Sequence, residues 1–328
     1  MKKSTRNILL GTGLIAAGAA AVSAISYRLT QTLVKVALDR KQPKLSSIKH
    51  AQISGAIPDP KVLEEVKKAT EWLLNCGCKT VEITARDGER LVGHFYACPN
   101  AKRILIAMHG WRSSWTNDFS LISKFWHENH CSVLYVEQRG QGNSGGDYIG
   151  FGLTERYDCL DWINFVDQNV QACLPIYLAG LSMGASTVLM ASGLELPQNV
   201  CGIMADCGYT SIYEIWKHVS KKNLRMSYGM IGKFADDMCR KRLQIGTRDY
   251  STTDALRVNR KIPVLLIHGT DDKFVPIDMT YENYKACAAP KQLFIVPGAE
   301  HCMSYLVDTK GYECVVKEFW ENHDRAIE

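Results

Sequence analysis

The sequence lacks the patterns that mark several common classes of function. Its net charge is only +5 over 328 residues, and the basic side chains are spread along the chain rather than gathered in one stripe. A nucleic-acid-binding protein needs such a stripe, so no nucleic-acid partner is predicted. The glycine-rich stretch 137–146 does not end in Gly-Lys-Ser/Thr and lacks dinucleotide spacing. It is interpreted as a tight loop beside the functional site.

Paired cysteine spacings of the zinc-binding kind are also absent, although the chain has 12 cysteines. Cys76 and Cys78 form a Cys-x-Cys pair with no second pair nearby and no histidine pair after it. The other cysteines lie scattered in apolar contexts, as Cys131, Cys201 and Cys314 do. We interpret them as free, buried residues, which fits a reducing compartment. No metal and no organic cofactor is predicted.

What the chain does contain is enough apolar sequence for a large core. Hydrophobic residues make up 46% of it, and its length fits one large α/β domain with an insertion and an N-terminal appendage. Two alternating stretches predict an edge hairpin, and six mostly apolar runs predict buried parallel strands. In order, the eight stretches are 80–85, 91–97, 103–108, 132–136, 175–180, 200–205, 262–269 and 291–296.

The N-terminal appendage contains 18 uncharged residues, Ile8 to Ile25. This length is the lower limit for a membrane-spanning helix. One interpretation is a cleaved signal peptide with a small-residue site at 22–24, giving a secreted protein. The other is an uncleaved anchor, favoured because an amphipathic helical pattern continues through residues 27–39 without a break. Basic residues on both sides favour a cytoplasmic catalytic domain only weakly. We therefore expect a membrane-anchored protein.

These patterns divide the chain into four parts. Residues 1–45 are predicted to form the anchor helix and its amphipathic extension, and residues 46–79 a linker and a helix. The core comprises 80–207 and 255–328. Residues 208–254 lack strand patterns and are predicted to form a helical cap with a basic face, which is either solvated or turned towards anionic lipid. Its larger side chains either line an apolar pocket or attach the cap to the body: Tyr213, Trp216, Met226, Tyr228, Met230 and Phe234.

The strongest chemical signal is Gly-Leu-Ser182-Met-Gly, which lies between an apolar strand pattern and a helical one. A strand, a sharp turn and a helix form the setting of a nucleophile elbow. The turn exposes the Ser182 hydroxyl at the start of a helix, where the helix dipole favours developing negative charge. The serine at this position excludes the form of epoxide or haloalkane hydrolysis that uses a carboxylate.

Three further stretches complete a possible catalytic centre. His109-Gly110-Trp111 follows a buried strand, where it forms either a simple turn or an oxyanion site; in the second case the amides of Trp111 and Met183 are the donors. Asp271 and Asp272 follow the seventh strand, and both qualify as the acid. His301 follows the last strand on a glycine-containing loop. The order serine, acid, histidine is the one expected for this arrangement.

These motifs together resemble the α/β-hydrolase superfamily over about residues 80 to 320. Within it, the chain is similar to membrane-anchored bacterial members near the serine-aminopeptidase and monoglyceride-lipase-like group. The resemblance implies the α/β-hydrolase fold, a mostly parallel, doubly wound eight-stranded sheet with a helical cap after strand six. In the family pattern His-Gly-x-x-Asp-x-x-Val-Pro the acid is the fifth residue, which selects Asp272. Glu137 departs from the aspartate that relatives often carry there.

We therefore expect a serine hydrolase that cleaves a carboxylic ester, thioester or amide through Ser182, His301 and Asp272. Its partner would be a small ester or acyl substrate. The alternative is a catalytically silent, membrane-tethered binding protein on the same fold. The presence of all three side chains favours the enzyme.

Overall fold

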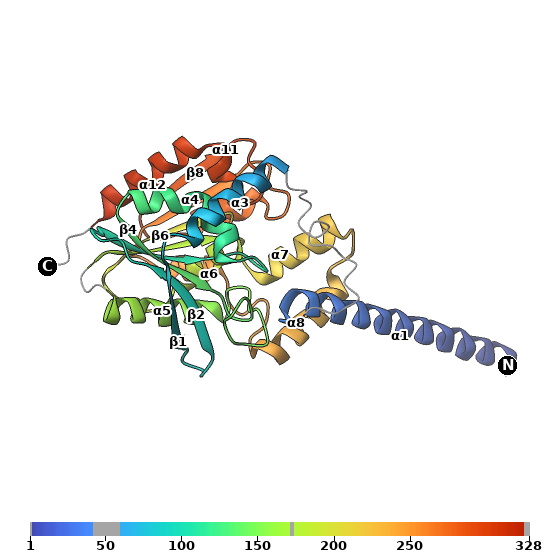
Figure 1. Ribbon diagram of the computed structural model, residues 1–328. Coiled ribbons are helices and arrows are strands. Elements are labelled where there is room, and N and C mark those ends of the chain that lie inside the picture. Colours follow the sequence, from blue (N-terminus) through green and yellow to red (C-terminus); the bar gives the residue numbers. More distant parts are fainter. Residues whose placement is uncertain (1, 42–59, 171–173, 325–328) are drawn as a thin grey trace.

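The computed structural model describes residues 2–41, 60–170 and 174–324, with side chains in the first helix described from residue 20 onward. The predicted linker at 46–59 therefore lies outside the described residues. Figure 1 shows one α/β body from which the N-terminal helix extends.

The body is built on a single eight-stranded sheet in the order β1-β2-β4-β3-β5-β6-β7-β8. The β1–β2 and β2–β4 pairs are antiparallel and all the others are parallel. The predicted fold, mostly parallel with an edge hairpin, is confirmed. The strands are β1 Lys79–Thr84, β2 Arg90–Tyr96, β3 Arg103–Met108, β4 Cys131–Glu137, β5 Ile176–Leu181, β6 Val200–Asp206, β7 Val264–Gly269 and β8 Lys291–Val296.

The central strands are continuous apolar runs because helices cover both faces of the sheet. Successive side chains of a strand point to opposite faces. Ile104 and Ile106 of β3 accordingly pack in one apolar cluster with Trp162, whereas Leu105 packs in a second cluster with Phe319. Figure 1 shows α4 (Trp115–Glu128) and α12 (Thr309–His323) on one side of the sheet and α5 (Glu155–Asn169) and α6 (Met183–Ala191) on the other.

The body helices begin at recognisable sequence signals. Ser114 and Ser251 cap α4 and α9 by accepting hydrogen bonds from amides three residues later. The bounds are α3 Pro60–Leu74, α4 Trp115–Glu128, α5 Glu155–Asn169, α6 Met183–Ala191, α9 Thr252–Val258, α10 Ile277–Ala286, α11 Ser304–Val307 and α12 Thr309–His323.

A helical insertion follows β6, as predicted. It contains α7 (Ile212–His218), a π-helical turn (Val219–Asn223) and α8 (Gly229–Leu243). These elements lie between the carboxyl edge of the sheet and the N-terminal helix (Figure 1). The exact domain limits drawn from the sequence remain predictions.

The N-terminal helix α1 spans Lys2–Leu38 and combines the predicted apolar segment and amphipathic extension in one element. Within the described part of the chain, no helix has the length and apolarity needed to cross a membrane. Residues 8–19 of the predicted anchor lie outside the residues whose side chains are described, and residues 20–38 give the anchor no support. The C-terminal half of α1 instead packs on the body: Val34 and Leu38 are fully buried, and the helix lies against α8.

Candidate active site

Ser182 occupies the sharp turn between β5 and α6. Its backbone angles are φ 55° and ψ −112°, a conformation that side-chain-bearing residues rarely adopt. The turn is possible because glycines flank it. A β-carbon on Gly184 would overlap the carbonyl of Met108, and one on Gly180 would overlap the backbone of Gly184. The turn at the end of β5 is therefore closely packed against the end of β3.

Asp272 lies in the loop after β7, and its side chain is completely buried. The amides of Phe274 and Val275 each donate to Oδ1 at 2.9 Å. Its neighbour Asp271 is exposed and accepts from the hydroxyl of Thr270. The two carboxylates that the residues alone left as alternatives thus occupy different environments.

His301 lies in the loop after β8 and contacts both other side chains. Its Nδ1 donates to Asp272 Oδ2 at 2.6 Å, and its Nε2 accepts from the Ser182 hydroxyl at 2.9 Å. The structure thus brings the three predicted residues into one hydrogen-bonded line. They meet because the carboxyl ends of parallel strands β5, β7 and β8 lie at one edge of the sheet.

The Asp272 carboxylate and the His301 imidazole each favour the charged form of the other. Burial raises the pKa of the Asp272 carboxyl, but attraction to His301 and hydrogen bonds from His268 and His301 outweigh it and lower the pKa below its usual range. Burial lowers the pKa of His301, while Cys207 and the Asp272 carboxylate raise it, and the raising contributions win. The arrangement therefore stabilises an ionised acid beside a basic imidazole.

The His109-Gly110-Trp111 loop lies directly against the elbow. A β-carbon on Gly110 would lie 3.5 Å from Ser182 Cβ. The amide of Gly110 donates to Asp118 Oδ2 at 2.6 Å. His109 is fully buried; its Nε2 accepts from the amide of Gln138, which links this loop to the next one. Trp111 directly follows Gly110, and Met183 directly follows Ser182. The role of their backbone amides as oxyanion donors remains a prediction.

Glu137, the residue that departs from the family pattern, lies at the start of the glycine-rich loop and accepts hydrogen bonds from a later residue of the loop. Its carboxylate accepts from His94 Nε2 at 2.7 Å and from the amide of Asn143. Burial raises its pKa, but these donors lower it to about 2. The longer side chain is thus bound by donors from β2 and from the glycine-rich loop.

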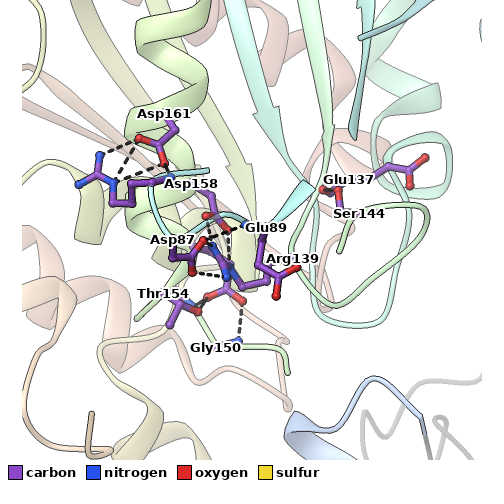
Figure 2. A network of polar contacts seen from close by, with 12 residues as sticks. Asp87, Glu89, Glu137, Arg139, Ser144, Gly150, Thr154, Asp158 and Asp161 are labelled. Atoms are coloured by element: carbon purple, nitrogen blue, oxygen red, sulfur yellow. Dashed lines mark hydrogen bonds and ion pairs between the residues drawn. The ribbon is translucent and has the colours of Figure 1, made fainter. Parts of the chain in front are cut away.

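A buried ion pair holds the same loop to the body (Figure 2). Arg139 contacts Asp158 of α5 at 2.5 Å and Asp87 of the β1–β2 turn at 2.7 Å. Arg139 and Asp158 are nearly inaccessible to solvent, whereas Asp87 is half exposed. The loop beside the site is therefore tied to two elements that lie far from it in sequence.

Two features of the site escaped the sequence analysis. The first is His268, expected only to pack. Its Nε2 donates to the carbonyl of Val275 at 2.9 Å and lies 3.2 Å from Asp272 Oδ2, and the Thr280 hydroxyl lies 2.6 Å from its Nδ1. Cys207, Cys302 and His301 bring three possible metal ligands within 4.8 Å of one another. The His-Gly-x-x-Asp spacing could have indicated the first feature, because it puts the histidine at the strand end next to the acid. Cys207 and Cys302 lie 95 residues apart, so no local spacing reveals the second.

Comparison with known proteins gives a consistent result. Residues 104–308 match the family described as "Alpha/beta hydrolase family". The uncharacterized protein YqkD of Bacillus subtilis is 26% identical over 74% of this chain and 78% of its own. Protein bem46 of Schizosaccharomyces pombe is 22% identical over 76% and 79% of the respective chains.

Solved structures show the same fold. The Pyrococcus furiosus esterase Pf2001 superposes with a TM-score of 0.63 at 22% identity, covering 76% of this chain and 92% of the esterase. Est1E of Butyrivibrio proteoclasticus, solved with ferulic acid bound, has a TM-score of 0.59 at 18% identity, covering 74% and 98%.

Proposed function

Since the chain belongs to the alpha/beta hydrolase family, we propose that it is a serine hydrolase that cleaves carboxylic esters. The observation that carries the proposal is the line from Ser182 Oγ through His301 to Asp272, with distances of 2.9 and 2.6 Å. The esterase and the ferulic-acid-binding protein among its structural neighbours favour an ester over other acyl substrates.

In the proposed mechanism Ser182 Oγ attacks the ester carbonyl carbon while its proton moves to His301 Nε2. Asp272 keeps the imidazole oriented and stabilises the imidazolium that forms. The amides of Trp111 and Met183 would stabilise the oxyanion, each contributing on the order of 10²–10³ in rate. The C–O bond to the alcohol then breaks, and the departing oxygen takes the proton from His301.

Water completes the cycle in the same site. His301 removes a proton from the water as it attacks the acyl-enzyme, and the Ser182 oxygen leaves with that proton. The products are a carboxylic acid and an alcohol, and the enzyme returns to its starting state. Every proton transfer uses the one imidazole, so the proposal depends on its two hydrogen bonds.

The test is hydrolysis of p-nitrophenyl butyrate together with labelling by a fluorophosphonate. Ser182→Ala should lower kcat by at least about 10⁴-fold and abolish labelling, because no other group replaces the nucleophile. Ser227→Ala, the same change at an exposed serine of the cap, is the control and should retain the wild-type kcat and the labelling. A folded wild-type protein without turnover or labelling would instead favour the silent binding protein.

A further inference from the structure

An apolar cavity borders the candidate site and is closed on one side by α1. Its enclosed volume is about 100 Å³, or about 760 Å³ when the space of its open mouth is included. Trp111 and Phe274 form its border with the site: Phe274 packs edge-on against the His301 ring, with centroids 5.0 Å apart. The rest of its wall comes from α1 and from the cap, and includes Thr30, Leu33, Val34, Ala37, Trp216 and Tyr228.

The wall formed by α1 has the spacing of one helical face. Residues 30, 33, 34 and 37 recur at intervals of three and four, so their side chains lie along the same stripe. Facing them are Trp216 and Tyr228, two of the cap residues for which the sequence left pocket lining and packing as alternatives. Met230 is 45% exposed and belongs to neither wall.

The end of α1 is also hydrogen-bonded to the loop proposed to hold the oxyanion. Trp111 Nε1 donates to the carbonyl of Ala37 at 2.9 Å, and Arg112 donates to the carbonyls of Val36 and Asp39 at 2.7 Å. The last carbonyls of a helix have no partner within it, and a cation there complements the helix dipole. The contacts therefore fix α1 and this loop relative to each other.

We propose that residues 30–38 of α1 are part of the substrate site, where they close a pocket for a linear, apolar acyl chain. The inference rests on the proposed ester hydrolysis and adds the class of acyl group. The cavity wall is almost entirely apolar and adjoins the imidazole, so the chain attached to the reacting carbonyl would lie in it. Acetate-sized groups would leave it unfilled.

The first experiment measures kcat/KM for p-nitrophenyl esters with acyl chains of increasing length. Each added methylene should raise kcat/KM about fourfold until the pocket is full, equivalent to about 0.8 kcal/mol per methylene. Leu33→Phe narrows the pocket and should shift the preferred acyl chain to a shorter length. Leu29→Phe, on the exposed side of the same helix, is the control and should shift nothing.

A second measurement separates this inference from the proposed reaction. Trp111 and Trp216 line the cavity, so octanoate binding to the Ser182→Ala protein should change tryptophan fluorescence, and Leu33→Phe should weaken binding at least tenfold. Chain-independent hydrolysis, or a Leu33→Phe protein with unchanged selectivity and binding, would overturn the role of α1 while leaving the esterase proposal intact. Octanoate binding without hydrolysis would support the pocket and refute the reaction.

A second, independent feature is the group formed by Cys207, His301 and Cys302. Cys207 follows β6 and is fully buried, while Cys302 is partly exposed. Their sulfurs lie 3.6 Å apart, and a ring nitrogen of His301 lies within 4.8 Å of both. Two Zn–S bonds of about 2.3 Å in tetrahedral geometry place the sulfurs about 3.8 Å apart. The two thiols therefore already have close to the required separation.

We infer that this group binds a soft divalent cation of the Zn²⁺ kind. Two thiolates and an imidazole are ligands that zinc prefers, and a fourth position would remain for water. On binding, the two thiols release their protons to solvent and the His301 ring becomes a ligand. The metal would thus compete with the hydrogen bonds of His301 to Ser182 and Asp272.

The test is a Zn²⁺ titration in competition with a chromophoric chelator, with ester hydrolysis followed in parallel. We expect one Zn²⁺ per chain, at least tenfold weaker binding in Cys207→Ser and Cys302→Ser, and no change in Cys314→Ser, an exposed control. Inhibition should follow occupancy and be reversed by EDTA. Binding that is equal in all variants would overturn the site; a Cys207–Cys302 disulfide found in place of zinc binding would assign the pair to redox chemistry instead.

Discussion

At the scale of single residues, both oxygens of Asp272 are occupied by donors from this chain. Oδ1 receives two amides, and Oδ2 receives His301 and lies 3.2 Å from His268. A carboxylate held this way stays ionised and fixes the direction of its donors. His268 therefore acts on the proposed reaction through Asp272, as a positioning residue.

We expect His268→Ala to lower kcat about ten- to hundredfold with little change in KM. The reason is the loss of a hydrogen bond to a charged group, worth about 1.5–3 kcal/mol. His268→Gln, which can still donate through its amide, should recover part of the rate. Steady-state kinetics measure kcat and KM of both variants. A variant that is less stable but has an unchanged kcat would show that His268 only packs in the core.

The pH dependence follows from the raised pKa of His301. In the proposed mechanism the neutral imidazole is the active base, so kcat/KM should rise with pH through a midpoint above the ordinary histidine value of 6.5. Asp272→Asn removes the facing charge, so the midpoint should move to lower pH while the plateau falls about 10⁴-fold. Asp271→Asn, the exposed neighbour, is the control for a pH–rate profile, and a similar shift there would contradict this assignment.

At the scale of elements, the site depends on loops that are held from outside it. Arg139 ties the glycine-rich loop to α5 and to the β1–β2 turn through one guanidinium. Burial raises the pKa of Asp158 to about 6 even though Arg139 opposes this rise. Without its partner the carboxylate would be left buried and unpaired.

Arg139→Ala should therefore lower the free energy of unfolding by about 3–5 kcal/mol, the usual cost of breaking a buried pair. Arg257→Ala breaks an exposed pair with Asp254 and should cost about 1 kcal/mol or less. Urea unfolding at neutral pH measures both. Equal, small losses would show that the loop does not depend on this contact.

Much of this arrangement could be predicted from the sequence, because local patterns carry it. Apolar runs marked the strands, and glycines around Ser182 marked the elbow. The strand order of the fold then brings the loops bearing Asp272 and His301 to the same edge. The contacts of α1 could not be found this way, since Trp111 and Ala37 lie 74 residues apart and meet only in the folded chain.

At the scale of the whole molecule, α1 lies outside the stretch that matches the family and yet is packed into the body. Residues 20–29 are mostly exposed, whereas residues 30–38 are buried or half-buried except for Thr32. Asp39 pairs with Arg242 of α8 at 2.9 Å, and Arg40 donates to the carbonyls of Gly142 and Ser144. The helix thus projects from the body before Thr30 and packs against the body after it.

Truncation should reveal this change. Removal of residues 1–19 should leave the melting temperature unchanged, because Thr30 is the first buried residue among those of α1 whose side chains are described, residues 20–38. Removal of residues 1–41 should lower the free energy of unfolding by about 3–6 kcal/mol, from the lost burial of Val34 and Leu38 alone. Calorimetry and urea unfolding measure these effects. Equal stability of both fragments would show α1 to be dispensable.

The pairing of Asp39 with Arg242 joins positions 203 residues apart in the chain. During synthesis the N-terminal segment emerges first, long before α8 leaves the ribosome. The apolar stripe of α1 must then remain uncovered for most of translation. A nascent chain of this protein should consequently be a client for chaperones that shield exposed helices, and should gain the proposed esterase activity only after its cap has left the ribosome.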